Sequence, residues 1–172
     1  DGIFAIVMTL LVLELKVPEI LGLVTSNTIV EVLKGAAAPL LAYILSFAML
    51  FTYWRAHNYI VSALAKNIDI WLTNINAVFL FFVGLVPFTT YLLGRYHETQ
   101  AAIFIYGVNV VAIGLSLFWL RYYIRTAGSI QNVPITLAEN RRGNIRVLMP
   151  VFLALLAIAL SYKRSFALSL SR

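Results

Sequence analysis

Cysteine is absent from this sequence of 172 residues, which excludes disulfides and thiolate metal sites within it. Charged residues make up only 12%, about half the share that is typical of soluble domains. Glycine-rich phosphate loops, the zinc-binding His-Glu-x-x-His motif and the nucleophile elbow are missing as well. Enzymatic chemistry therefore has no candidate residues, and we expect neither a cofactor nor a fixed metal site.

Hydrophobic residues, in contrast, make up 62% of the chain, which indicates an integral membrane protein. The net charge of +6 does not point to a nucleic acid partner, because the basic residues stand between apolar runs. In that position lysine and arginine set membrane topology or contact anionic lipid headgroups. Membrane lipids are therefore expected partners and nucleic acids are not.

Hydropathy predicts a single all-helical transmembrane domain that covers residues 1–172 and has at least five spans. The expected spans are residues 2–17, 36–57, 70–93, 101–120 and 147–162. Gly84 and Pro87 predict a kink in the third span. The fifth is short for a core of about 30 Å, so it must extend at one end or be shielded. Residues 166–170 are expected to open a sixth span, and residues 58–69 and 121–146 to be polar links.

The link after the fourth span is strongly basic, with one acid, Glu139, against five arginines: Arg121, Arg125, Arg141, Arg142 and Arg146. Loops rich in lysine and arginine stay in the cytoplasm. The even-numbered spans are therefore predicted to end in the cytoplasm, and the same reasoning predicts a cytoplasmic N-terminus.

The first span has two different faces when it is drawn as a helix at about 100° per residue. One stripe collects small and branched residues: Gly2, Ile6, Thr9, Leu10, Leu13 and Val17. Phe4, Met8, Leu11 and Leu15 lie opposite and suit lipid or a neighbouring helix. Such a stripe is either a packing seam or, around a symmetry axis, the wall of a narrow pore. On its own, the Thr9 hydroxyl most often bonds to its own backbone.

Polar residues within the spans allow two interpretations. Trp54 and His57 lie on one helix face and, with Asp1, could form a buried polar layer that ties helices together. Alternatively, they are an interfacial aromatic and a hydrated histidine. Asn74, Asn76 and Asn109 are expected to make interhelical hydrogen bonds rather than to bind a ligand.

The first eighteen residues, DGIFAIVMTLLVLELKVP, resemble the first helix of bacterial relatives of the lysosomal potassium channel called transmembrane protein 175. In that family a Phe-Ser-Asp motif opens the helix, and Asp1 matches its aspartate. Residues 54–57 (Trp-Arg-Ala-His), Asn74 and residues 87–89 (Pro-Phe-Thr) match later parts of the family pattern.

The resemblance implies a cation channel in a bacterial cell membrane that prefers K⁺ to Na⁺. It implies a homotetramer of six-helix subunits whose first helices line a central pore. The aliphatic bottleneck of the family falls on Ile6, further aliphatic rings on Leu10 and Leu13, and a selectivity-associated threonine on Thr9. The ring of Ile6 would act as gate and filter.

Two other classes of membrane protein remain open from the residues alone. A secondary transporter needs broken helices or buried charge at the midplane, and apart from Glu14 the spans offer no such charge. No internal repeat indicates the paired halves of many transporters. A structural membrane protein needs no pore, and the stripe on the first span would then be a seam.

Overall fold

The computed structural model describes residues 2–15, 26–127 and 136–170. Its regular elements are all helical, so the expected all-α fold is confirmed. Their bounds are α1 Gly2–Leu13, α2 Ser26–Gly35, α3 Ala37–Tyr59, the π-helical turn η1 Ile60–Leu64, α4 Ile70–Gly84, α5 Val86–Arg95, α6 Gln100–Thr126 and α7 Leu137–Leu170.

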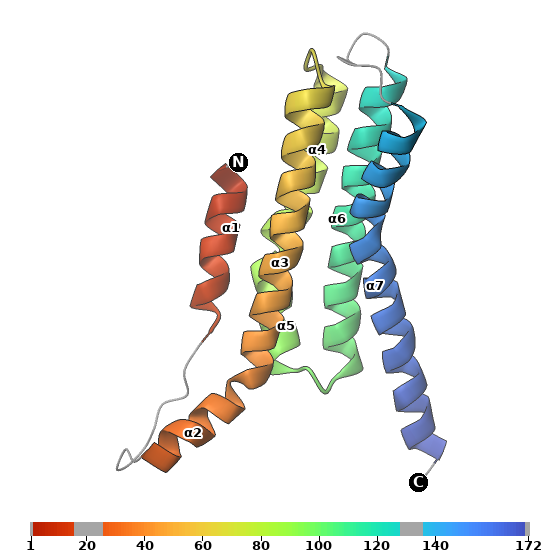
Figure 1. Cartoon of the computed structure of the whole chain (residues 1–172). Coiled ribbons are helices and arrows are strands. Elements are labelled where there is room, and N and C mark those ends of the chain that lie inside the picture. Colours follow the sequence, from red (N-terminus) through yellow and green to blue (C-terminus); the bar gives the residue numbers. More distant parts are fainter. Residues whose placement is uncertain (1, 16–25, 128–135, 171–172) are drawn as a thin grey trace.

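The long helices stand side by side, as Figure 1 shows, with α1 on one flank of the bundle and α7 on the other. α6 packs along α7 and α4, while α3 packs along α5. α1 contacts α3, α4 and α5. Large side chains from α1, α3, α4 and α6 fill the core between them: Phe4, Leu11, Leu50, Tyr53, Phe79, Ile113 and Leu117.

Four helical segments in the described part of the chain are long and apolar enough to cross a membrane: Ala37–Ser62, Ile70–Arg95, Gln100–Thr126 and Glu139–Tyr162. They correspond to the second to fifth expected spans. α1 has 12 residues and rises about 18 Å at 1.5 Å per residue, less than a bilayer core. The expected end of the first span, residues 16–17, lies outside the described residues.

The third span is broken where the sequence predicted a kink. α4 ends at Gly84, Leu85 lies between the two helices, and Pro87 stands in the first turn of α5. Proline is tolerated there because the first N–H groups of a helix have no intrahelical acceptor. The break lets the second half of the span adopt its own direction against α3.

Two expectations about the links and one about a sixth span were wrong. Residues 58–64 are helical, because α3 runs to Tyr59 and continues as η1. Arg141, Arg142 and Arg146 belong to α7, since arginine is a good helix former outside a membrane. Residues 166–170 continue α7 instead of opening a sixth span. The helix of the fifth span therefore extends beyond residues 147–162 at both ends, so it is long enough to cross the membrane although its apolar run is short.

Capping side chains explain where α4 and α6 begin. Asp69 accepts a hydrogen bond from the backbone N–H of Leu72 at 2.7 Å, and Thr99 accepts one from Ala102 at 3.4 Å. The hydroxyl of Tyr123 donates to Asp69 at 2.6 Å and so joins the start of α4 to the end of α6. This bond, with the Leu72 N–H, holds the pKa of Asp69 below its usual value.

Candidate functional site: the exposed face of α1

α1 turns one apolar face into the subunit and leaves the other uncovered. Phe4, Val7 and Leu11 are at most 4% exposed. Ile6, Leu10 and Leu13 are 59%, 42% and 66% exposed. The residues expected to suit lipid or a neighbouring helix therefore contact neighbouring helices, and the stripe of branched residues points away from the subunit's own core.

Thr9 also lies on the exposed side of α1. Its hydroxyl donates a hydrogen bond to the backbone carbonyl of Ile6 at 2.8 Å, one turn earlier. The self-bonding alternative is therefore realised within the subunit. The hydroxyl oxygen keeps a free acceptor position beside Ile6, because an O–H group that donates one bond still carries lone pairs.

His57 is buried behind α1, at 8% exposure. Its Nε2–H donates to Oδ1 of Asn76 on α4 at 2.7 Å, which fixes the tautomer of the ring. The imidazole stacks on the ring of Phe79, with the two ring centroids 5.0 Å apart. The ring centroid of Phe4 on α1 is 5.9 Å from that of His57. His57 thus links α3 to α4 and forms part of the surface on which α1 rests.

The other two members of the expected polar layer are Trp54 and Asp1. Trp54 is half-buried, and its ring centroid is 5.8 Å from that of Phe51 on the same helix. Asp1 lies outside the described residues. Asn76, which the expected layer did not include, is a partner that the structure brings to His57. Asn74, two residues away on the same helix, is exposed in the subunit.

A second group of buried polar side chains joins α3, α5 and α6. Thr90 donates to Ser46 at 2.7 Å, and Ser46 shares a hydrogen bond with Tyr106 at 3.0 Å. Asn109 donates to Thr89 at 3.2 Å, which confirms the interhelical bond expected of Asn109. Sequence reasoning missed Ser46, Thr89 and Thr90, although lone hydroxyls within apolar spans are a usable signal for such bonds.

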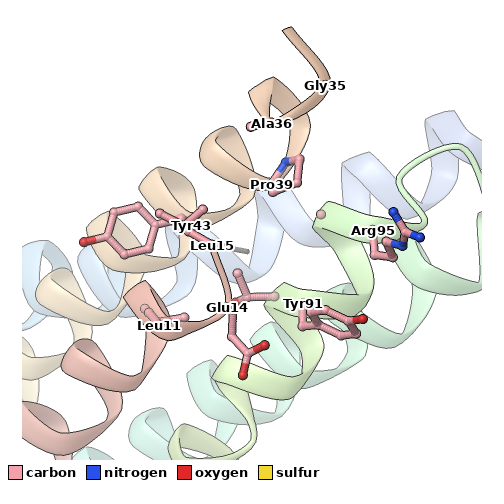
Figure 2. Close-up of a pocket in the computed structure, with 11 residues that line it drawn as sticks. Leu11, Glu14, Leu15, Gly35, Ala36, Pro39, Tyr43, Tyr91 and Arg95 are labelled. Carbon is pink, nitrogen blue, oxygen red and sulfur yellow. The ribbon is translucent and has the colours of Figure 1, made fainter. Parts of the chain in front are cut away.

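A cavity of about 350 Å³ lies at the other end of α1 (Figure 2). We name it the Glu14 cavity. Its walls come from the residues that follow α1, from the start of α3 and from the end of α5, including Glu14, Pro39, Tyr43, Tyr91 and Arg95. At its edge Gly94 approaches α3 so closely that a Cβ there would be 2.9 Å from Cα of Pro39.

Metal binding by side chains finds no support in the part of the chain that the structure describes. It brings no three histidine or acidic side chains together in a way that could hold an ion. The chemistry that the exposed face of α1 can offer is thus that of an apolar surface with one hydroxyl. Such a surface can pack against another copy, or, around an axis, narrow a water-filled path.

Comparisons with known proteins point to one family. Residues 1–87 match the family model described as "Endosomal/lysosomal potassium channel TMEM175". A protein named a potassium channel from Chryseobacterium sp. (strain P1-3) is 33% identical over 112 residues, which are 64% of this chain and 54% of the relative. Another from Chamaesiphon minutus is 37% identical over 123 residues, which are 67% and 57% of the two chains.

A solved structure is similar over almost the whole chain. It is the crystal structure of a lysosomal potassium-selective channel TMEM175 homolog from Chamaesiphon minutus, with a TM-score of 0.62 and 27% identity. The match covers 99% of this chain and 90% of that one. The alignments to the two curated relatives, in contrast, span little more than half of their length, 54% and 57%.

Proposed function

Because this membrane protein belongs to the TMEM175 family of potassium channels, we propose that it forms a potassium-selective channel. The observation that carries the proposal is the exposed branched stripe on α1. Ile6, Leu10 and Leu13 face away from the subunit's core although they are as apolar as the residues that form it. Lipid, a partner surface or a pore can cover such a face, and the relatives named potassium channels favour the pore.

The proposed channel is a homotetramer. A single copy of α1 cannot enclose a path for ions, so several copies must meet at an axis, and a closed ring is the simplest arrangement. Four copies of α1 would then present Ile6 to one another. The remaining contacts of the assembly are with membrane lipids.

Ile6 is the proposed bottleneck, and it acts there as an apolar side chain without oxygen ligands. A ring of isoleucine side chains gives a passing cation no oxygen ligand, so the ion must keep part of its water shell or the ring must widen. K⁺ releases water more readily than Na⁺, and a closed apolar ring stops flow by dewetting. Leu10 and Leu13 extend the apolar wall, and Thr9 supplies an oxygen beside it. No cofactor takes part, and the permeant ion is K⁺.

The basic residues support a location in a bacterial cell membrane with the N-terminus in the cytoplasm. Arg121 and Arg125 at the end of α6 and Arg141, Arg142 and Arg146 at the start of α7 lie near one end of the bundle. Such a concentration favours the cytoplasmic side. In this orientation the Glu14 cavity faces the outside.

Recording from purified protein in planar bilayers tests the proposal. We expect single-channel currents with a reversal potential that favours K⁺ over Na⁺. Ile6→Asn should raise the current and move the reversal potential towards that of an unselective pore, because it wets the constriction. Val12→Asn is the matched control, since Val12 is 50% exposed on a different side of the same helix. Phe4 is unsuitable as a control because it belongs to the core.

Two results would contradict the proposal. A wild-type protein that carries no current, or only flux coupled to a second ion, is not a channel. Equal effects of Ile6→Asn and Val12→Asn on the reversal potential would remove Ile6 from the bottleneck. Native mass spectrometry in detergent checks the assembly separately, and a protein seen only as monomers would exclude the tetramer.

A further inference from the structure

The Glu14 cavity holds two opposite charges that do not neutralise each other. Glu14 is half-buried and Arg95 is exposed at the rim. Figure 2 shows their side chains pointing in different directions, with Tyr91 between them. The described residues contain no salt bridge that joins the two. A ligand with a positive and a negative group on a short linker could contact both charges at once.

Aromatic side chains complete the polar wall of this cavity. The rings of Tyr43 on α3 and Tyr91 on α5 both line it. An ammonium group near such rings is attracted to their faces, by about 0.5 to 2 kcal/mol in known cases. Because the carboxylate of Glu14 belongs to the same lining, the cavity suits a cation that also donates hydrogen bonds.

The depth of the cavity indicates where the ligand comes from. One membrane-crossing segment begins at Ala37 and another ends at Arg95. The cavity is lined by residues at both of these ends, so it lies at the boundary of the membrane-crossing part. Lipid headgroups are located at the ends of membrane spans. Leu15 and Pro39 add an apolar wall beside the charged one, which suits the glycerol and upper acyl region of a lipid.

We infer that the Glu14 cavity binds the headgroup of a phosphatidylethanolamine-type lipid. The ammonium group lies at Glu14 and the two tyrosines, and the phosphate lies at Arg95. A primary ammonium donates hydrogen bonds to a carboxylate, which a choline group does not do. The volume of about 350 Å³ is within the range of small-ligand sites, which begins at about 300 Å³.

Binding there would act on the proposed pore helix. Glu14 follows Leu13, the last residue of α1, and its backbone N–H bonds to the carbonyl of Leu11 at 3.3 Å. A lipid headgroup held by Glu14 therefore fixes the end of the helix that carries Ile6 and Leu10. The site itself does not depend on conduction, so it stands or fails separately from the proposed function.

Native mass spectrometry of the full chain tests the site. The protein is purified in detergent, mixed with equal amounts of phosphatidylethanolamine, phosphatidylcholine and phosphatidylglycerol, and the retained lipids are counted. We expect the wild type to retain phosphatidylethanolamine selectively. Glu14→Gln and Arg95→Gln should each lower this retention about tenfold, which corresponds to about 1.4 kcal/mol for one charged contact.

Matched controls and a charge-neutral variant make the experiment decisive. Glu98→Gln and Arg55→Gln remove exposed charges outside the cavity and should leave retention unchanged. Ala36→Leu adds bulk to the lining without changing a charge and should also expel the lipid. Circular dichroism verifies that each variant remains helical. If Arg95→Gln unfolds, Arg95→Lys replaces it and should lose only part of the lipid retention.

Three outcomes would overturn the inference. Equal retention of all three lipids would show that the cavity does not recognise a headgroup. Retention of phosphatidylethanolamine that survives both Glu14→Gln and Ala36→Leu would place the lipid elsewhere. If the protein binds soluble phosphoethanolamine but retains no lipid, the cavity recognises the ammonium and phosphate groups of a soluble ligand, and a lipid is excluded.

Discussion

The two faces of α1 are almost equally apolar, yet the structure treats them in opposite ways. Phe4 and Leu11 are fully buried against α3, α4 and α5, whereas Ile6 and Leu13 are more than half exposed. The buried and exposed residues differ in shape rather than in hydrophobicity. The buried face carries the aromatic ring of Phe4, which contacts the rings of His57 and Phe79. In a membrane, where lipid is as apolar as leucine, close packing decides which face turns inward.

Phe4 and Leu10 provide the strongest test of this difference. Phe4→Ala should destabilise the subunit by about 3 kcal/mol, because it leaves a cavity beside the stacked rings of His57 and Phe79. Leu10→Ala should change stability by about 0.5 kcal/mol or less, because its side chain is exposed. Unfolding of the purified protein in detergent by a denaturing surfactant measures both. Equal losses would show that Leu10 is packed as tightly as Phe4 in the purified protein, which contradicts this difference.

Two glycines extend the same contrast to other helices. Gly114 is buried in α6, and a Cβ there would collide with the side chain of Val151 and lie 2.8 Å from the hydroxyl of Tyr53. Gly114→Ala should therefore cost about 2 kcal/mol through overpacking. Gly84→Ala is the control, since nothing lies within 4 Å of its added Cβ. A thermal shift of the same size in both variants would contradict the proposed tight contact between α6 and α7.

The bond between His57 and Asn76 should have a smaller effect. A double-mutant cycle of His57→Ala and Asn76→Ala should give a coupling of about 1 kcal/mol, as for other interhelical hydrogen bonds in membranes. His57→Ala and Trp54→Ala should also lower the yield of assembled protein in size-exclusion chromatography. If both variants assemble normally but selectivity is lost, the polar layer acts in conduction rather than in assembly.

The partly buried bond between Asp69 and Tyr123 should have the smallest effect, and this effect should depend on pH. The pKa of Asp69 is lowered in the folded protein, chiefly by the Tyr123 hydroxyl, so its stabilising contribution is present above the ordinary aspartate value of about 4. This contribution is lost as the pH falls through the lowered value. Asp69→Asn should reduce the melting temperature slightly at neutral pH and not in strong acid. A difference that persists in acid would contradict this assignment.

Hydropathy was sufficient to predict the spans but not the full lengths of the helices. A run of apolar residues marks where a chain crosses a membrane, and the second to fifth of the expected spans match the four long segments of the structure. It does not mark where a helix continues into water. The turns that carry Tyr59, Arg141 and Arg146 were therefore assigned to links.

The phase of α1 could be predicted, but its partners could not. Helical periodicity separates Ile6 from Phe4 on any wheel, because it depends only on local geometry. The contact between His57 and Asn76 joins residues 19 positions apart and depends on how α3 and α4 are rotated about their axes. Glu14 and Arg95 are still further apart in sequence. One sequence does not fix such rotations, so the cavity and the hydrogen-bond partner appear only in the structure. Whether Ile6 narrows a pore stays a prediction.

The close approach of Gly94 to Pro39 limits how this protein can vary. Any side chain at position 94 would meet the backbone of α3, which cannot yield as the end of a flexible side chain can. In a library with every amino acid at this position, glycine should be recovered almost alone, whereas position 35, with open space around it, should accept many residues. A position that touches no ion can thus be among the least variable in the chain, because it sets the distance between two helices.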